Sequence, residues 1–537
     1  MRCAGVVRSE RVDALGLTVH HFFPQLCLLS ALLAAGPIQA GLAEGEPASA
    51  RVGTDLEIAL RALPPGIRAA ASEAPSSLAV EYTVDAALEA RIREILARHR
   101  VDLAHVIVMD PATGEVFAYV STDPKTFPAT RAYPTASLMK LVTAAAVLRE
   151  RPSAARQKCR YLGSPYEVDV SQLTAPRSGG HLDSFDDALA ISNNQCFARL
   201  AVHDVGRAAL LDEIERVGLL VPPGIGHPGG RIESVDQKLA LGRLGSGLAG
   251  SFFSPLAAAR LAAALARGEL VEPHWIARVR DTTGEIVAVP EVAPPRRIWN
   301  PEVADVLRHS LRGVTERGTA RRAFRNEQGE PLLGDVTVAG KTGTLSGDEP
   351  KGLYHWFIGV APAEEPRIAI ATLVVHDSDV SARRGGAGTN ASNIAAETLR
   401  ALLCDGTGCG ADRVAPLYAR ANARRTESTA ELEAQRAARD RARIAAARVE
   451  PARLLEDSDM KFPRSLRRQK VEGEVVLVVS VAPSGAVANV RVDASDLPER
   501  FGTHVTEVVN GWKFAPATRG GEPIASEVRL RIPIEIR

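Results

Sequence analysis

The chain has 537 residues, of which 45% are hydrophobic and 24% are charged. One hydrophobic core rarely serves a chain of this length, so we expect two or three domains. Lysine and arginine number 65 against 64 aspartate and glutamate residues. This balance lacks the basic surplus that favours nucleic-acid binding, and we expect no nucleic-acid partner.

Residues 1–43 have the features of an export signal. Three arginines precede an apolar run over 26–35, and small residues follow it. This order is typical of a secretory signal peptide. A membrane-spanning helix needs roughly 20 apolar residues, so the run is short for a permanent anchor. We predict cleavage after Ala40 or Ala43 and a periplasmic mature chain; an uncleaved segment anchored in the inner membrane is the alternative.

Two of the six cysteines fall inside this signal. The mature chain keeps four, at Cys159, Cys196, Cys404 and Cys409. An even number in an oxidising compartment is typical of disulfide-bonded proteins. The close spacing of the last two permits a local disulfide, whereas four free or buried thiols are the alternative. No His and Cys residues have the spacing of a metal site, and we expect neither a metal nor a cofactor.

The region after the signal begins without a clear structural pattern. Residues 44–84 are rich at first in alanine, proline, serine and glycine, and we interpret them as a linker. Apolar residues at helical spacing then predict a helix over 85–100. Apolar runs at 106–109 and 116–120 flank an Asp-Pro-Ala-Thr-Gly turn. Strand, turn and strand together indicate a β-hairpin.

A largely helical middle follows inside a domain that we place at 85–410. The helices are predicted at 138–149, 185–205, 208–217 and 255–267. The last has proline in its first turn, where the missing N–H donor costs nothing. Strand patterns return at 354–360 and 367–375. Strands at both ends with helices between them favour an α+β fold, an antiparallel sheet packed with helices.

The last two segments differ from this domain. Residues 411–450 are rich in arginine and alanine and lack a wide apolar stripe, so we predict a charged, solvated helical linker. Contact with anionic peptidoglycan or phospholipid is the alternative interpretation. Residues 451–537 show strand patterns at 473–481, 488–492 and 526–536 and a helix pattern at 499–510. They predict a small α+β domain.

The first candidate motif is Ser137-Leu-Met-Lys140. A serine hydroxyl is a poor nucleophile until a base takes its proton. Residues three apart on a helix share a face, so Lys140 can reach Ser137. A desolvated lysine can be neutral enough to act as that base. A serine at a helix N-terminus also faces free backbone N–H groups, which can stabilise an oxyanion.

Two further motifs follow along the chain. Ser192-Asn-Asn194 offers a hydroxyl that can relay a proton to a leaving group and an amide that can hold a substrate amide. Lys341-Thr342-Gly343, followed by Thr344, offers a cation and hydroxyls that suit a carboxylate. Gly343 lets a substrate lie close to the backbone. On its own, the Lys-Thr-Gly sequence is typical of a strand end and turn.

Each motif is weak when it is taken singly. Ser458-Asp-Met-Lys461 also matches the first motif, and we interpret it as a solvated domain boundary. The order of the three motifs is more specific, because it is the combination described for penicillin-binding proteins and serine β-lactamases.

With these motifs in place, residues 85–403 resemble the transpeptidase domain of penicillin-binding proteins. The resemblance extends beyond the motifs, through Asp110–Gly114, Tyr133–Ala146, Leu241–Gly247, Arg317–Ala320 and Trp356–Pro362. It implies that Ser137 is acylated by a peptidoglycan stem peptide ending in D-Ala-D-Ala and that Lys140 takes its proton. Ser192 and Asn194 then serve the relay and the substrate amide.

The same resemblance implies how the substrate is held. Lys341, Thr342 and Thr344 bind the terminal carboxylate, and the backbone N–H groups of Ser137 and Thr344 form the oxyanion hole. The amine of a second peptide resolves the acyl-enzyme, and β-lactams are covalent inhibitors. No glycosyltransferase domain fits before residue 85, so polymerisation of glycan strands is not expected.

Three alternatives to a D,D-transpeptidase remain open. A D,D-carboxypeptidase uses the same site with water as the acceptor. A β-lactamase is disfavoured, because no Glu-x-x-Leu-Asn segment lies between the second and third motifs and Ser192-Asn-Asn194 replaces the Ser-x-Val of the class D type. The alternative of another class is a non-catalytic protein that senses or docks muropeptides or β-lactams.

Residues 451–537 resemble a TonB C-terminal domain. The resemblance lies in Phe462–Leu466, Gly473–Leu477, Gly485–Val490 and Trp512–Thr518. It implies a periplasmic protein partner, bound partly by strand addition. A proline-rich spacer and an energising N-terminal helix are not evident, so we expect a docking or wall-anchoring module. We expect Trp512 and Phe514 to belong to its core.

Overall fold

A five-stranded antiparallel sheet forms the centre of the larger domain. The computed structural model describes residues 55–68, 77–376 and 389–537, so the predicted signal peptide lies outside the described residues. The sheet has the order β13 (Ala339–Asp348), β14 (Lys351–Ala361), β15 (Ile368–His376), β2 (Leu103–Met109) and β3 (Val116–Ser121). Among the described strands, β13 therefore forms an edge of this sheet.

Helices cover the central strands of this sheet. Almost every side chain of β2, β3 and β15 is buried, which requires cover on both faces. The helix α8 (Pro255–Arg267) packs against β2, β14 and β15, and α11 (Ala391–Leu403) packs against β14 and β15. Every residue of α8 except Arg267 is buried, since its many alanines allow close approach. The antiparallel sheet packed with helices agrees with the α+β prediction.

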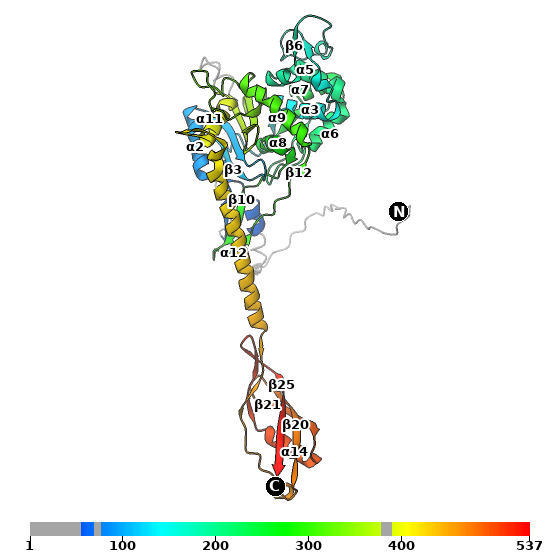
Figure 1. Cartoon of the computed structure of the whole chain (residues 1–537), viewed down its shortest axis with the longest axis vertical. Helices are drawn as coiled ribbons and strands as arrows, with labels where there is room; N and C mark the ends of the chain where they lie inside the picture. The colour runs from blue at the N-terminus through cyan, green and yellow to red at the C-terminus, as the bar shows by residue number, and fades with distance from the viewer. Residues whose placement is uncertain (1–54, 69–76, 377–388) are drawn as a thin grey trace, which may run out of the picture. The chain divides into compact units, whose positions relative to one another are not determined.

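The middle helices form a group beside this sheet (Figure 1). The group includes α3 (Met139–Glu150), α5 (Asn194–Arg199), α6 (Gly206–Arg216) and α7 (Lys238–Ser246), with α4 (Phe185–Ala190) and α9 (Pro301–Glu316) packed together beside it. The single helix predicted over 185–205 is wrong. The chain leaves helical geometry at Ser192, whose φ is 61°, and the Asn193 side chain caps α5 by accepting from the Cys196 N–H.

The linker predicted over 44–84 is too long. Residues 55–60 are helical, and Ala59 and Ile67 are buried in the domain core. The strand β1 (Leu78–Tyr82) pairs along β10 (Ile276–Asp281) in a second, three-stranded sheet that β11 (Ile286–Ala288) completes. The composition of this segment is typical of a linker, but pairing with a strand far along the chain overrides that local signal.

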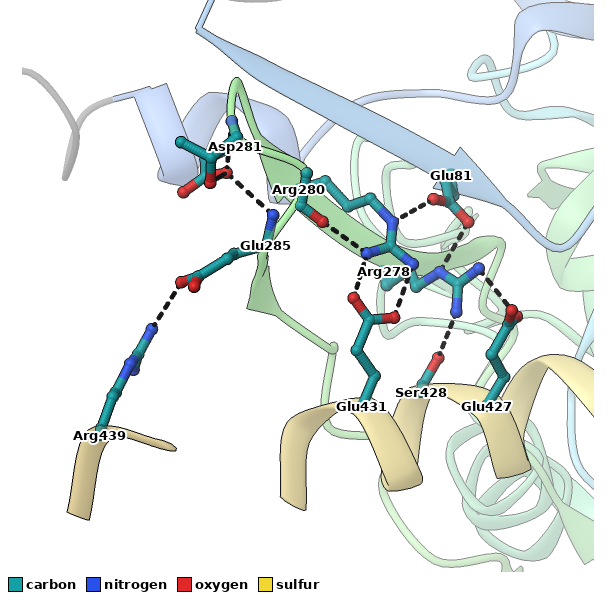
Figure 2. A network of polar contacts seen from close by, with 11 residues as sticks. Glu81, Arg278, Arg280, Asp281, Glu285, Glu427, Ser428, Glu431 and Arg439 are labelled. Carbon is teal, nitrogen blue, oxygen red and sulfur yellow. Dashed lines mark hydrogen bonds and ion pairs between the residues drawn. The ribbon is translucent and has the colours of Figure 1, made fainter. Parts of the chain in front are cut away.

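The charged segment predicted as a linker is one helix, α12 (Ala415–Ala447), and its first half is bound to the domain (Figure 2). Arg278 and Arg280 of β10 both pair with Glu81 of β1. Arg278 also pairs with Glu427 at 3.0 Å, and Arg280 pairs with Glu431 at 2.6 Å. The domain therefore continues past the predicted end at residue 410.

A second set of ion pairs holds the same half of α12. The buried Glu115 carboxylate pairs with Arg424 and Arg425 at 2.7 and 2.6 Å. Residues 437–447 are exposed and match the predicted solvated helix. Within the ranges that the structure describes, no helix is both long and apolar enough to span a membrane.

The C-terminal segment folds around its own core. A three-stranded sheet has the order β21 (Val487–Ser495), β20 (Val471–Val481) and β25 (Ser526–Ile536), and α14 (Glu499–Val509) packs on it. These elements lie where the sequence patterns place them. Phe514 is buried in this core and Trp512 packs against it, as predicted.

Candidate active site

The three sequence motifs meet at one cavity of about 390 Å³ beside β13. Six of the eight candidate residues line it, namely Ser137, Ser192, Asn194, Thr342, Gly343 and Thr344. The other two, Lys140 and Lys341, are fully buried next to it. Segments that are far apart in the chain thus converge, as a catalytic constellation requires.

The nucleophile candidate lies in a strained turn. Ser137 is in a 3-10 turn at Ala136–Leu138, immediately before α3, and Ala136 has a φ of 49°. This left-handed geometry is uncommon for a residue other than glycine. Two glycines make room for the turn, because a Cβ on Gly247 would lie 1.9 Å from the Ala136 carbonyl oxygen and one on Gly343 would lie 3.0 Å from the Ala136 Cβ. Ser137 is left half-buried at the cavity wall.

Lys140 is placed to act on this serine. Its Nζ lies 2.8 Å from the Ser137 Oγ and 2.5 Å from both the Asn194 Oδ1 and the Ser246 carbonyl oxygen. A neutral amine has two N–H donors and one lone pair. It can donate to Asn194 and Ser246 and accept from the Ser137 hydroxyl. Burial, with a smaller effect from the nearby charge of Lys341, lowers the pKa of Lys140 well below its ordinary value.

The second and third motifs contact each other through Lys341. Its Nζ donates to the Ser192 Oγ and to the Thr342 carbonyl oxygen, both at 2.9 Å. Burial lowers the pKa of Lys341 to about 7. The interruption of the helix at Ser192 is what turns this hydroxyl toward the lysine.

Asn194 is already engaged by protein atoms. Its Oδ1 accepts from Lys140, and its Nδ2 donates to the Tyr166 carbonyl oxygen at 2.6 Å. It therefore connects the first motif to the loop that contains Tyr166. Its predicted role, contact with a substrate amide, stays a prediction.

The third motif lies within β13 and not at a strand end, which corrects the prediction from Lys-Thr-Gly alone. The strand continues to Asp348, and Thr344 lies opposite His355 of β14. The hydroxyls of Thr342 and Thr319 lie 2.5 Å apart. Thr342 and Thr344 both line the cavity, where their hydroxyls can meet a carboxylate.

Sequence reasoning missed His355 and Thr319, which also line the cavity. The His355 Nδ1 lies 3.3 Å from the Thr344 Oγ1. Burial, with a smaller effect from His376, lowers the pKa of His355 to about 4, so the ring is neutral at pH 7. The signal for this residue is the register of the β13–β14 hairpin, which places it opposite Thr344. Thr319 falls in a segment that was matched to the family without a role.

A disulfide fixes the loop beside the second motif. Cys159 is bonded to Cys196, which lies on α5 two residues after Asn194, and Cys404 is bonded to Cys409. The Gln195 side chain donates to the carbonyl oxygens of Leu162 and Ser164. The loop after Cys159 is thereby held against the start of α5.

The second Ser-x-x-Lys match differs from the first. Ser458 and Lys461 are both exposed, and the only carboxylate close to Lys461 among the described residues is Asp459, at 3.8 Å. The second match therefore lacks the buried lysine that Ser137 has beside it, which agrees with its interpretation as a solvated domain boundary. Over the described ranges, no group of three His, Cys, Asp or Glu residues is arranged to hold a metal ion.

The larger domain is similar to a known protein family. The sequence profile of the penicillin binding protein transpeptidase domain matches residues 104–400, more than half of the chain. The chain belongs to this family. The profile of the Gram-negative bacterial TonB protein C-terminal matches residues 458–535. Both resemblances seen in the sequence, and the fold class, are confirmed.

Curated relatives cover the same region. Peptidoglycan D,D-transpeptidase PbpA of Mycolicibacterium smegmatis is 26% identical over 343 residues, which are 56% of this chain and 67% of that protein. PbpA of Mycobacterium tuberculosis is 26% identical over 52% of this chain and 64% of its own length. The chain thus spans about two thirds of these relatives. Protein TonB of Xanthomonas campestris pv. campestris is 34% identical over 74 residues, 14% of this chain and 32% of that protein.

Solved structures of penicillin-binding proteins are also similar. PBPA from Mycobacterium tuberculosis is 21% identical, with a TM-score of 0.49 over 60% of this chain and 81% of that chain. Its imipenem acyl-enzyme complex is 21% identical, with a TM-score of 0.47 over 60% of this chain and 79% of that chain.

Proposed function

We propose that this protein is a serine D,D-transpeptidase that cross-links peptidoglycan stem peptides ending in D-Ala-D-Ala. The observation that carries the proposal is the buried Lys140 amine, 2.8 Å from the Ser137 Oγ at the wall of the cavity. The name of the PbpA relatives, peptidoglycan D,D-transpeptidase, supports the same substrate class.

The first half of the reaction acylates Ser137. The Oγ attacks the carbonyl carbon of the penultimate D-Ala, and the hydroxyl proton passes to Lys140. The tetrahedral oxyanion is stabilised by the backbone N–H groups of Ser137 and Thr344. The peptide C–N bond then breaks, and the proton held by Lys140 passes through Ser192 to the leaving nitrogen. The terminal D-Ala leaves as its amine, and Lys140 is neutral again for the second half. An ester between Ser137 and the shortened stem remains.

The second half transfers that acyl group. The amine of a second stem attacks the ester carbonyl and gives its proton to Lys140. The C–O bond breaks, the Ser137 oxygen takes the proton back, and a new peptide bond joins the two stems. Water in place of the amine gives a D,D-carboxypeptidase, which is the second candidate activity at the same site.

The third motif binds the terminal carboxylate in this proposal. Lys341 supplies the positive charge, while the hydroxyls of Thr342 and Thr344 donate to the carboxylate oxygens. Gly343 keeps the path to Ser137 open, because a Cβ there would crowd Ala136. The carboxylate of a β-lactam can occupy the same position, and these drugs are therefore proposed as covalent inhibitors.

Slow hydrolysis of the acyl-enzyme separates this proposal from a β-lactamase. None of the described residues that line the cavity carries a carboxylate that could activate water. We infer that the acyl-enzyme ester is hydrolysed slowly and reacts mainly with an amine. A penicillin adduct is therefore expected to be long-lived.

The proposal places the chain in the cell envelope. Two disulfides and a predicted export signal favour the periplasm. The TonB-like segment at 458–535 then serves as a docking module for a periplasmic protein partner or the wall.

The test is the intact mass of the purified mature protein after brief incubation with a penicillin, beside Ser137→Ala. A stable adduct on the wild type that is absent from the variant supports the acyl-serine mechanism. Rapid loss of the drug without an adduct indicates a β-lactamase. If there is neither an adduct nor loss of the drug, the non-catalytic muropeptide sensor becomes the better hypothesis.

A further inference from the structure

A second cavity, of about 490 Å³, adjoins the catalytic one. It is formed by β4 (Tyr133–Pro134), β8 (Ser251–Phe253) and the second half of β13. Leu248 lines both cavities, and the lining passes along β13 from Thr344 in the first to Leu345 in the second. We call this second cavity the flanking groove.

Side chains of both charges line the flanking groove. Two arginines and three carboxylates take part, namely Arg131, Arg231, Glu233, Asp348 and Glu349. Arg131 pairs with Glu349 at 3.0 Å. The other three form no ion pair with any residue that the structure describes. The groove therefore offers one cation and two anions to a ligand.

The cation is held in place. The Arg231 guanidinium lies 3.5 Å from the centre of the Phe252 ring, a stacking contact that orients its N–H donors. Glu233 follows on the same strand end, and its backbone N–H donates to the Gly250 carbonyl oxygen at 2.8 Å. The two opposite charges thus stand on one short segment beside the groove.

The distance along β13 fits a stem peptide. A peptide bound in extended form along this edge strand advances about 3.4 Å per residue, so the path from Thr344 to Asp348 is about 14 Å. With the terminal carboxylate at the third motif and the penultimate carbonyl at Ser137, the third residue from the end falls opposite Leu345–Gly347. A long side chain on that residue reaches the charges of the groove.

We propose that the flanking groove binds a diamino-acid side chain that ends in both an ammonium and a carboxylate. Arg231 binds the carboxylate, and Glu233 with Asp348 binds the ammonium. The assignment rests on the proposed function and names the feature of the stem peptide that the site selects. The same side chain is present in the acyl donor and in the acceptor stem, and the experiment separates the two.

The donor arm uses N-acetylated tripeptides that end in D-Ala-D-Ala and begin with meso-diaminopimelate, L-lysine or Nε-acetyl-L-lysine. D-Alanine release is measured with glycinamide as a common acceptor. The acceptor arm uses the Nε-acetyl-lysine donor and compares the amine of diaminopimelate with glycinamide. Wild type, Arg231→Ala and Glu233→Gln are compared, with Arg207→Ala as the control, since Arg207 is exposed and lines neither cavity.

In wild type we expect kcat/KM to be about tenfold higher for diaminopimelate than for the neutral compound in at least one arm. The neutral compound is Nε-acetyl-lysine in the donor arm, where lysine should fall between the two, and glycinamide in the acceptor arm. Arg231→Ala and Glu233→Gln should each cut that ratio to about twofold, and Arg207→Ala should leave it unchanged. Equal values for the charged and neutral compounds in both arms, or a ratio that survives both variants, overturn the proposal. Failure of a penicillin to acylate the wild type overturns the proposed function instead.

Discussion

The Nζ of Lys140 and the Oγ of Ser137 are 2.8 Å apart, and every other atom within hydrogen-bond distance of that amine in the described structure is an amide or backbone oxygen. No described carboxylate pairs with Lys140, so burial is not compensated by a counter-ion. The neutral amine is therefore the favoured form, and it is the form that can take a proton from the serine.

Replacing Lys140 by arginine should abolish rapid acylation. Arginine has a side chain of similar length, but it is always positively charged and cannot act as a base at working pH. A general base contributes about 10²- to 10⁴-fold, so the rate constant for acylation by a penicillin should fall by at least about 100-fold. Quenched-flow labelling measures it, with Lys461→Arg in the exposed second match as the control. Wild-type rates in Lys140→Arg would falsify the assignment of the base.

The pH profile should be bell-shaped. Lys140 must be neutral, and burial lowers its pKa well below the ordinary value, so activity rises with pH as that amine loses its proton. Lys341 must be charged to bind a carboxylate, and its pKa is about 7, so activity falls as pH rises through that value. The profile of kcat/KM for a D-Ala-D-Ala peptide reports both groups of the free enzyme. A profile that is flat from pH 6 to 9 contradicts this account of Lys341.

His355 should act through Thr344. Replacing the ring by phenylalanine keeps its shape and removes the nitrogen that lies 3.3 Å from the Thr344 hydroxyl. We expect KM for a carboxylate-bearing peptide to rise about three- to tenfold with a smaller change in kcat, as for loss of one hydrogen bond. Thr344→Val is the matched variant, and the double variant should be no worse than Thr344→Val alone. Fully additive effects would show that the two side chains act independently.

The two disulfides should differ in their contribution to stability. Cys159 and Cys196 are 37 positions apart, against 5 for Cys404 and Cys409. Loop-closure entropy then predicts losses of about 4 and about 2 kcal/mol, respectively, as upper values. Thermal unfolding of Cys196→Ser and Cys409→Ser measures the difference. Only Cys196→Ser should also slow acylation, because its bond holds the loop that contacts Asn194; equal effects on acylation argue against that link.

The ion pairs of Figure 2 should matter unequally. Arg278 is 7% exposed and pairs with Glu81 and Glu427, so Arg278→Met should lower the free energy of unfolding by about 1–3 kcal/mol. Arg439 pairs with Glu285 at 3.4 Å between largely exposed side chains, and Arg439→Met should change it by less than about 0.5 kcal/mol. Urea denaturation compares them. A similar small change in both variants would mean that α12 is not clamped by this network.

Local signals explain which elements the sequence predicts well. The helix predicted at 255–267 has the bounds of α8, because Ser254 caps its start, proline occupies its first position and Gly268 ends it with a φ of 69°. The predicted break-free helix over 185–205 failed for the opposite reason. Ser192 has a φ of 61°, which the apolar spacing of 185–205 does not reveal, and Asn193 then caps a new helix, α5.

The residues of the candidate site also differ in how well local sequence signals predict them. Its motif residues can be read from the sequence because their chemistry requires fixed spacing within each motif. His355 and Thr319 have no such spacing, and only the register of β13 with β14 and the packing of distant segments bring them to the cavity. The ion pairs that hold the first half of α12 could not be predicted for the same reason. Arginine and glutamate on a helix are expected to be solvated unless their partners, here Arg278 and Arg280 of β10, are known.

The contacts of Lys140 make one side chain report on several segments at once. It touches the nucleophile turn, the second motif and the end of α7 through Ser137, Asn194 and Ser246. Local opening of any of these segments removes a contact from the base before the whole domain unfolds. In a site that reacts as proposed, the rate of penicillin labelling under mild denaturant is therefore a readout of local cooperativity, and it should decline ahead of the global unfolding transition.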